Sequence, residues 1–167
     1  TVSSINDRAA VAYSTVYPLT MFLRVLTDEG IPSYSVSKEG YFETREIKLL
    51  LDYLKILDNP RQDIPLVAVL SSMLGDFSSE ELALVKGKGE GKYFYDRLYW
   101  YLSNGTEQEL QTKIQLFLNQ FNMFRAKVPY TAIHTLLNQI LTETGYSDII
   151  AALPAGEQRL ANVEMLL

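Results

Sequence analysis

The sequence of 167 residues predicts a mainly α-helical protein with a small α/β portion at its N-terminal end. Three observations lead to this fold class. Apolar residues recur at helical spacing over most of the chain after Tyr41. Residues that start and stop helices separate these periodic segments from one another. A single strand–helix–strand pattern precedes them, in residues 9–36.

The predicted α/β portion is one strand–helix–strand unit. Residues 9–13 are small and apolar, which is typical of a buried strand. Pro18 then opens a helix that Gly30 ends, and residues 31–36 have the pattern of a second strand. Such a unit is one step of a parallel sheet and is too small to be stable alone. We therefore expect the edge of a larger α/β sheet.

The first long helical segment, residues 43–57, has a single apolar stripe. Acidic residues come early and Lys55 comes late, as the helix dipole favours, and Asn59-Pro60 ends the segment. The stripe that we expect to be buried consists of Ile47, Leu50, Leu51, Leu54 and Leu57.

Several later helices have recognisable starts. Asp63 with Pro65 starts one helix, and Ser78 with Glu81 has the residue types of a capping box that starts another. An aromatic-rich helix is expected over residues 92–102.

The C-terminal part of the chain continues with helical segments. Thr106 resembles the first residue of a second capping box, which opens a long helix. Pro129 starts the next helix and Gly145 ends it. The last two helical pieces are expected at residues 147–153 and 156–167.

Composition and charge exclude several classes of function. The chain has no cysteine and a single histidine, His134, which excludes a disulfide scaffold and a thiolate metal site and leaves a His-rich zinc site unsupported. The formal net charge of −5 disfavours binding of the chain alone to nucleic acid or to an anionic membrane. No apolar run approaches the roughly 20 residues of a membrane span, and no secretion signal is present. We expect a cytoplasmic protein with no membrane partner.

Both ends of the sequence resemble interior positions of a longer chain. The sequence begins at Thr1 without a methionine, and it stops at Leu167 within an amphipathic pattern that has no stop residue. We therefore expect a piece of a larger protein.

Residues 86–92, the glycine–lysine segment, invite comparison with a phosphate-binding loop. A Walker loop requires a Ser or Thr directly after its Gly-Lys pair, a buried strand before it and a helix after it. Here no Ser or Thr follows any Gly-Lys, and a helix precedes the segment. The sequence therefore predicts a flexible connection between helices.

Aromatic residues cluster directly after this segment. They allow two interpretations, a stacking platform for unpaired bases or packing residues between helices. Helical spacing spreads them over more than one face, which favours packing. The residues are Tyr93, Phe94, Tyr95, Tyr99, Trp100 and Tyr101.

Carboxylates are frequent in the first helices but form no obvious metal-binding pattern. Glu43, Glu46, Asp52, Asp58 and Asp63 lie at predicted helix starts and on solvent faces, which favours roles in dipole compensation and solubility. Nothing assembles a nucleophile, a base and an oxyanion site. We expect no catalytic residue and no metal ligand in this chain.

Four stretches together carry a resemblance to a known family. Residues 39–55 resemble the aromatic-aromatic-Glu-x-x-Glu-Ile-Lys segment of UvrD/Rep-like superfamily 1 DNA helicases, and residues 10–32 are similar to the region around helicase motif IV. Residues 56–72 and 143–162 resemble the helicase–nuclease subunits of the AddA/RexA type, from the bacterial AddAB (RexAB) complexes.

The resemblance implies an ATP-driven DNA translocase and nuclease that processes double-strand breaks with a B-type partner subunit. Residues 1–85 would be the late part of the RecA-like motor domain 2A, and residues 86–167 the start of the helical 2B insertion. ATP and Mg²⁺ are then cofactors of the parent protein, with none expected in this piece.

The resemblance also assigns candidate site residues. Motif IV normally carries an arginine that faces the nucleotide, but Ser14 stands there, so no nucleotide-binding residue is expected. Ser71 stands where such helicases have Asn or Arg near single-stranded DNA, and Ser71 and Ser72 are the candidate DNA contacts. Tyr41 and Phe42 are expected to pack between a strand and the following helix.

A second class of function stays open from the residues alone. The acidic composition and the absence of a basic stripe are typical of a helical protein-interaction module unrelated to DNA. In either case we expect the isolated chain neither to hydrolyse ATP nor to cut DNA.

Overall fold

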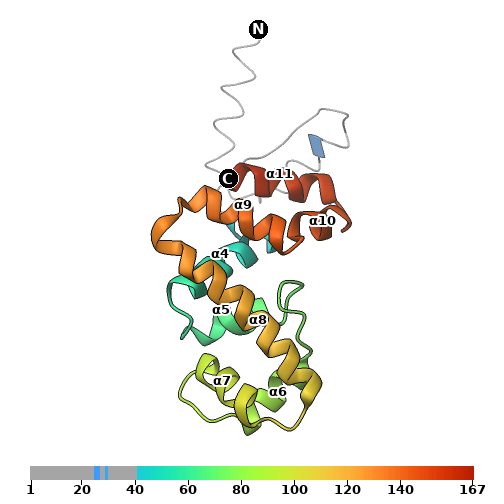
Figure 1. Cartoon of the computed structure of the whole chain (residues 1–167). Helices are drawn as coiled ribbons and strands as arrows, with labels where there is room; N and C mark the ends of the chain where they lie inside the picture. Colours follow the sequence, from blue (N-terminus) through green and yellow to red (C-terminus); the bar gives the residue numbers. More distant parts are fainter. Residues whose placement is uncertain (1–24, 27–28, 30–40) are drawn as a thin grey trace, which may run out of the picture. The chain divides into compact units, whose positions relative to one another are not determined.

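The structure, a computed structural model, describes residues 25–26, 29 and 41–167. The expected strands at residues 9–13 and 31–36 and the motif IV position, Ser14, lie outside the described residues. Val25 and Leu26 are helical, within the helix expected between Pro18 and Gly30. In the part from residue 41 onward the structure is mainly helical and contains no strand, as predicted for this region (Figure 1).

Residues 41–167 form one compact unit of successive helices. Helix bounds follow the expected order of segments. They are α4 (Arg45–Asp58), α5 (Asp63–Leu70), α6 (Ser79–Lys88), α7 (Phe94–Asn104), α8 (Gln108–Lys127), the 3₁₀ helix η1 (Val128–Tyr130), α9 (Ile133–Glu143), α10 (Tyr146–Ala151) and α11 (Gly156–Leu166).

Helix α8 is the long central element of this unit. It leads from the end that carries α6 and α7 to the end that carries α9, α10 and α11 (Figure 1). Along this path α8 packs against α7, α4 and α9 in turn. Helix α4 in turn contacts α5 and α11, so helices far apart in the sequence share one core.

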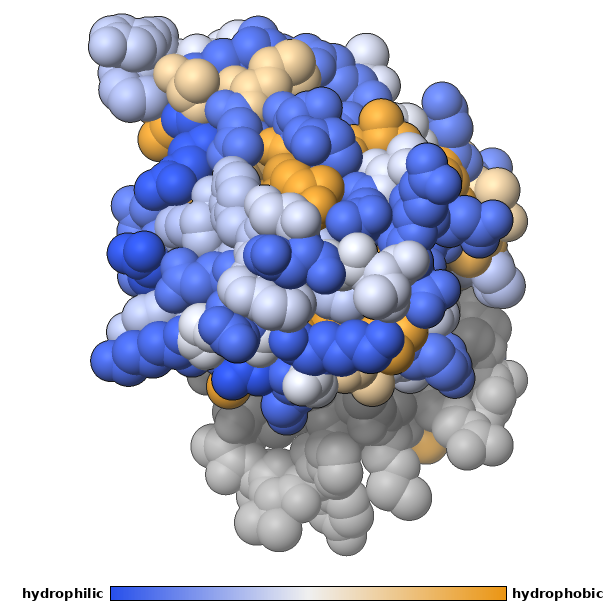
Figure 2. All heavy atoms as spheres, turned by 60° about the horizontal axis from the view of Figure 1, so that its bottom comes forward, coloured by the Kyte–Doolittle hydropathy of each residue, from blue (hydrophilic) through white to orange (hydrophobic). Residues whose placement is uncertain are grey.

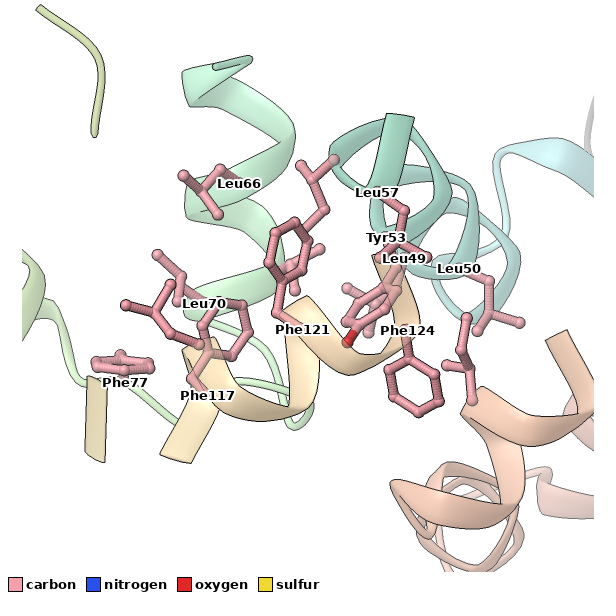
Figure 3. Packing of buried hydrophobic residues seen from close by; sticks show 14 of the residues in the cluster. Leu49, Leu50, Tyr53, Leu57, Leu66, Leu70, Phe77, Phe117, Phe121 and Phe124 are labelled. Atoms are coloured by element: carbon pink, nitrogen blue, oxygen red, sulfur yellow. The ribbon is translucent and has the colours of Figure 1, made fainter. Parts of the chain in front are cut away.

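Aromatic side chains of α8 form the middle of that core. Phe117, Phe121 and Phe124 are spaced to lie on one helix face, and all three are buried. Figure 3 shows Phe117 beside Phe77 and Phe124 beside Tyr53, with ring centroids 6.1 Å apart for Phe77–Phe117 and 6.3 Å apart for Tyr53–Phe124. Both pairs have the edge-to-face arrangement that aromatic rings prefer.

The buried face of α4 is wider than the predicted stripe. Ile47, Leu50 and Leu57 are buried as expected, but Leu51 and Leu54 are only half-buried. Additional buried positions are Leu49, Tyr53 and Ile56. The reason is that α4 contacts α5, α8 and α11 on different sides, whereas a stripe assumes one neighbour.

Two local predictions of helix ends are confirmed. Ser78 and Glu81 form a full capping box, in which the Glu81 N–H donates to the Ser78 hydroxyl (3.2 Å) and the Ser78 N–H donates to the Glu81 carboxylate (2.8 Å). Gly145 follows α9 with φ of +66°, the left-handed conformation that ends many helices.

Two other predicted helix starts are wrong. Helix α8 begins after Glu107 without a side-chain cap, because the N-cap position is Glu107 and Thr106 lies one residue too early; the Thr106 hydroxyl accepts a hydrogen bond from Lys88 Nζ at 3.3 Å. Pro129 lies in η1, and α9 begins later, at Ile133. The Ile133 side chain, at the start of α9, is 64% exposed.

The buried core continues on both sides of the predicted 2A/2B division at residues 85 and 86. Val85, Phe94 and Leu98 belong to the same hydrophobic cluster as the residues of α4 and α5. The division itself therefore stays a prediction drawn from the resemblance. In the described part of the chain, no helix combines the length and apolar character that crossing a membrane requires.

Candidate nucleic-acid interface

The candidate DNA contacts Ser71 and Ser72 directly follow α5. The exposed Ser71 hydroxyl donates to the Ala68 carbonyl at 3.2 Å. The half-buried Ser72 hydroxyl donates to the Val69 carbonyl at 2.6 Å and accepts from the Leu74 N–H at 3.1 Å. The Ser71 oxygen thus stays accessible to a ligand, whereas the Ser72 hydroxyl is used inside the turn.

The loop after these serines is held tightly against α5. The Phe77 N–H donates to the Leu70 carbonyl at 2.9 Å, and the Phe77 ring is buried. A Cβ added at Gly75 would lie 2.4 Å from the Leu70 carbonyl oxygen, so only glycine fits there. Asp76 has φ of +59°, a conformation that short polar residues tolerate. The serines are therefore presented by a rigid turn.

A shallow groove of about 600 Å³ separates this loop from α8. It is lined on one side by Leu74 and Asp76 and on the other by Lys113, Phe117 and Met123 of α8, among others. Leu74 and Asp76 of the groove follow the candidate serines closely in the chain, and the lining includes both apolar and charged side chains.

Lys113, which lines the groove, forms an ion pair with Glu81 of α6. Its Nζ lies 2.9 Å from the Glu81 carboxylate, 3.9 Å from Asp76 and 5.1 Å from the centre of the Phe77 ring. Burial alone would raise the pKa of Glu81, but the Ser78 N–H and the Lys113 ammonium outweigh it and lower that pKa. Glu81 therefore stays ionised and completes both the cap and the ion pair.

The aromatic residues that follow the glycine–lysine segment act in packing, as predicted. Phe94 and Tyr101 are buried, and Tyr95 and Trp100 are half-buried against the same core. Tyr99 is 38% exposed, but its hydroxyl is within hydrogen-bonding distance of other side chains. These rings do not form one exposed face on which bases could stack.

Glu46 is a polar centre that the sequence did not reveal. It was expected on a solvent face, and this prediction is wrong, because Glu46 is only 5% exposed. Its carboxylate accepts from Arg159 Nη1 and from Asn162 Nδ2 of α11, both at 2.7 Å. The Tyr146 hydroxyl donates to the Glu46 carbonyl at 3.1 Å, and the Tyr41 hydroxyl donates to the Asn162 carbonyl at 2.7 Å.

The Glu46 cluster, defined by Glu46, Tyr41, Tyr146, Arg159 and Asn162, joins both ends of the compact unit. Burial raises the pKa of Tyr146 to about 12, so its hydroxyl stays a donor. No sequence pattern could have found the cluster, since its two halves lie 100 or more positions apart in the chain. Tyr41 is half-buried in this cluster and Phe42 is 48% exposed, while the strand against which both were expected to pack lies outside the described residues.

The other carboxylates discussed above are separate from one another. Asp52 is buried rather than on a solvent face, because α4 has neighbours on several sides, and it pairs with Lys55 at 2.8 Å. Glu43 lies 3.6 Å from Lys48. Asp63 is the first residue of α5. Its carboxylate accepts a hydrogen bond from the Phe94 N–H at 2.8 Å, which fixes the start of α7.

Comparison with known proteins adds the family. A family model described as UvrD-like helicase C-terminal domain matches residues 4–164. A relative from Clostridium acetobutylicum, named as the A-type subunit of an ATP-dependent helicase/nuclease, is 40% identical over 161 residues, which are 96% of this chain and 13% of that relative. Proteins of the same name from Alkaliphilus oremlandii and Bacillus cereus are 36% and 38% identical over 87% and 83% of this chain.

The chain spans only 11–13% of the length of these relatives. The similarity therefore concerns one part of a much longer protein, in agreement with the expectation from the sequence. The family match, in contrast, extends over nearly all of the chain. The chain thus belongs to the family of UvrD-like helicase C-terminal domains.

Proposed function

We propose that this chain is the part of an ATP-dependent DNA helicase/nuclease subunit in which motor domain 2A passes into the helical 2B-type insertion. Residues 1–85 belong to 2A and residues 86–167 to 2B. Family membership, the helical architecture after residue 41 and the names of the relatives support this proposal. The parent subunit would act on DNA double-strand breaks in recombinational repair, together with a B-type subunit.

Within that subunit the role of the chain is contact rather than catalysis. The described residues do not form a Walker-type nucleotide site, because helix α6 rather than a strand leads into the glycine–lysine segment and no Ser or Thr follows a Gly-Lys pair. The ATP and Mg²⁺ of the family then belong to other parts of the parent. A phosphate-release assay on the 167-residue chain is expected to give no turnover, and turnover that survives repurification would contradict this assignment.

The observation that carries the DNA contact is the placement of Ser71. Its hydroxyl is exposed at the end of α5, and the turn behind it is fixed by the Ser72 hydroxyl and by buried Phe77. This hydroxyl donates to the Ala68 carbonyl, so it contacts a phosphate oxygen by exchanging that hydrogen bond for one to the phosphate, without a charge. Ser72 acts as a positioning residue in this arrangement.

The test replaces Ser71 in two directions and measures binding of a fluorescent single strand. In the parent subunit, Ser71→Ala is expected to weaken binding by about 2- to 10-fold, the value of one hydrogen bond. Ser71→Arg is expected to tighten binding and to steepen the salt dependence by about 0.7 per added phosphate contact. Unchanged affinity and unchanged salt dependence in both variants would refute a DNA contact at this position.

Membership of a helicase family favours this proposal over the alternative, a helical interaction module unrelated to DNA. That interpretation rested on composition alone, and the chain belongs to a helicase family. Contacts with neighbouring domains or with the B-type subunit remain part of the proposed function, as additional roles of the helical surface.

A further inference from the structure

We propose that the glycine–lysine segment, with Arg61 and Tyr93 beside it, binds the phosphodiester backbone of DNA without regard to base sequence. This surface is separate from the Ser71 position and goes beyond the proposed function. It rests on the proposed function only in taking the polyanion to be DNA.

The lysines of this segment differ from the others that the structure describes. Lys48, Lys55, Lys113 and Lys127 each form a salt bridge with a carboxylate. Among the described residues, no carboxylate lies within salt-bridge distance of the remaining lysines, Lys86, Lys88 and Lys92, which are all exposed. Among the lysines that the structure describes, those without an ionic partner therefore lie in one short segment of an otherwise acidic chain.

Arg97 holds this segment in shape. Its Nε donates to the Gly91 carbonyl at 3.1 Å, and its Nη1 donates to the Lys86 carbonyl. The two bonds connect the end of α6 and the connection that follows it, residues 89–93, to α7. The prediction of a flexible connection over residues 86–92 is wrong for residues 86–88, which form the last turn of α6. Lys86 and Lys88 therefore project from the end of a helix, and Lys92 projects from a connection that Arg97 holds.

Two glycines of the segment let its backbone pack closely against α6 and α7, and the neighbouring amides point to no acceptor among the described residues. A Cβ added at Gly89 would lie 2.4 Å from the Val85 carbonyl oxygen, and Gly91 has φ of +142°, so side chains are excluded at both positions. A Cβ at Gly87, in contrast, would meet nothing within 4 Å. In the described part of the structure, the N–H groups of residues 90–92 have no acceptor. Free amides beside lysines are the donors that phosphate oxygens require.

Tyr93 and Arg61 extend the positive surface and explain why it would contact backbone rather than bases. The Lys92 ammonium lies 5.1 Å and the Arg61 guanidinium 5.8 Å from the centre of the Tyr93 ring. The ring therefore already lies beside two cations, which favours contact with the phosphate backbone over stacking of a base. Arg61 also pairs with Asp96 at 3.3 Å, which holds it in place.

The surrounding surface fits a charged ligand better than an apolar one. Figure 2 turns the end that carries α6 and α7 toward the reader, and that face is mostly hydrophilic, with hydrophobic atoms in small separate patches. Residues 86–97 together with Arg61 contain five basic and two acidic side chains, in a chain whose net charge is −5. A local excess of positive charge of this kind is the footprint of phosphate binding.

The test compares two triple variants of the 167-residue chain that remove the same charge from different places. Lys86→Gln/Lys88→Gln/Lys92→Gln neutralises the glycine–lysine segment. Lys48→Gln/Lys55→Gln/Lys127→Gln neutralises three lysines that have carboxylate partners. Circular dichroism first shows that both variants are folded. Fluorescence anisotropy then measures the affinity at several salt concentrations for a 20-nucleotide oligothymidylate, for a 20-base-pair duplex and for an oligoglutamate with the same charge as the oligothymidylate.

The wild-type chain is expected to bind DNA, and the segment variant is expected to lose affinity on the order of a hundredfold at 50 mM salt. Its salt slope should fall by about 2, as for three lost phosphate contacts. The control variant should lose far less. Preference for the duplex or the single strand then identifies the form of DNA that is bound.

Several results would overturn the inference. They are no DNA binding by the wild-type chain at 50 mM salt, equal losses in the two triple variants, and oligoglutamate binding as tight as DNA binding. A segment variant that behaves like wild type, combined with a weakened Ser71→Ala variant, would refute this surface and leave the proposed DNA contact intact. The converse result would refute the Ser71 contact alone.

Discussion

Glu46 connects the start of α4 to α11, and its replacement tests what stabilises the compact unit. Glu46→Ala removes two charge-assisted hydrogen bonds, from Arg159 and Asn162, each 2.7 Å long. A hydrogen bond to a charged group contributes about 1.5–3 kcal/mol. Because the Arg159 side chain is 29% exposed and can be rehydrated, the lower value applies, and we expect a loss of about 3 kcal/mol in the free energy of unfolding.

The matched control is Glu43→Ala, which removes a glutamate three positions earlier. The Glu43–Lys48 pair is 3.6 Å long, with side chains 75% and 60% exposed, and should contribute less than about 0.5 kcal/mol. Urea denaturation followed by circular dichroism measures both variants. Equal losses in the two variants, or a Glu46→Ala loss below about 0.5 kcal/mol, would refute the view that the Glu46 cluster holds the ends of the unit together.

The same carboxylate predicts a pH dependence. Burial alone would raise the pKa of Glu46, but hydrogen bonds from Asn162 and the Arg159 charge lower it below its ordinary value of 4.5. Its stabilisation is therefore complete above that value and is lost as the pH falls through the lower, folded-state pKa. The stability difference between wild type and Glu46→Gln should be constant near pH 7 and should shrink below about pH 4.5. A difference that grows on acidification would contradict the assignment.

Five further substitutions, at four positions, test the packing and the turns. Gly89→Ala places a Cβ against the Val85 carbonyl and should lower the free energy of unfolding by about 1–3 kcal/mol. The control Gly87→Ala, in open space within α6, should leave it unchanged or raise it by up to about 1 kcal/mol. Equal effects of the two variants in urea denaturation would contradict the close packing at Gly89. Phe121→Ala in the core should cost about 3–5 kcal/mol, and a loss below about 1 kcal/mol would place this ring outside the core. Ser78→Ala should cost about 1 kcal/mol through the lost cap, and Ser78→Thr should retain most of it, as thermal unfolding can measure.

Features that depend on neighbouring residues were predictable from the sequence. The capping box of Ser78 and Glu81 closes within four residues, and the left-handed Gly145 needs only its own backbone. The order of the helices follows from the same local signals. Family membership, too, was visible in short ordered motifs, and the comparison confirms it.

Features that depend on distant residues were not predictable. Glu46 has the sequence context of a solvent-exposed first-turn acid, and only the arrival of α11 buries it. Thr106 has a good capping pattern, but the helix begins one residue later, after Glu107, and the Thr106 hydroxyl bonds to Lys88 of another helix. The rigidity of the glycine–lysine segment comes from Arg97, which lies in the next helix. In each case a partner from another element overrides a local preference.

The Glu46 cluster also constrains how this region can be recombined with that of a relative. Residues 41–46 hold one half of the cluster, and residues 146–162 hold the other. A hybrid that takes α4 from one protein and α11 from another would pair a carboxylate and a guanidinium that had not been matched, and the unit would lose stability. A segment exchanged between relatives should therefore include both halves of the Glu46 cluster. A replacement confined to the stretch between α5 and α9 should be tolerated, because residues 41–46 and 146–162 then still come from the same parent.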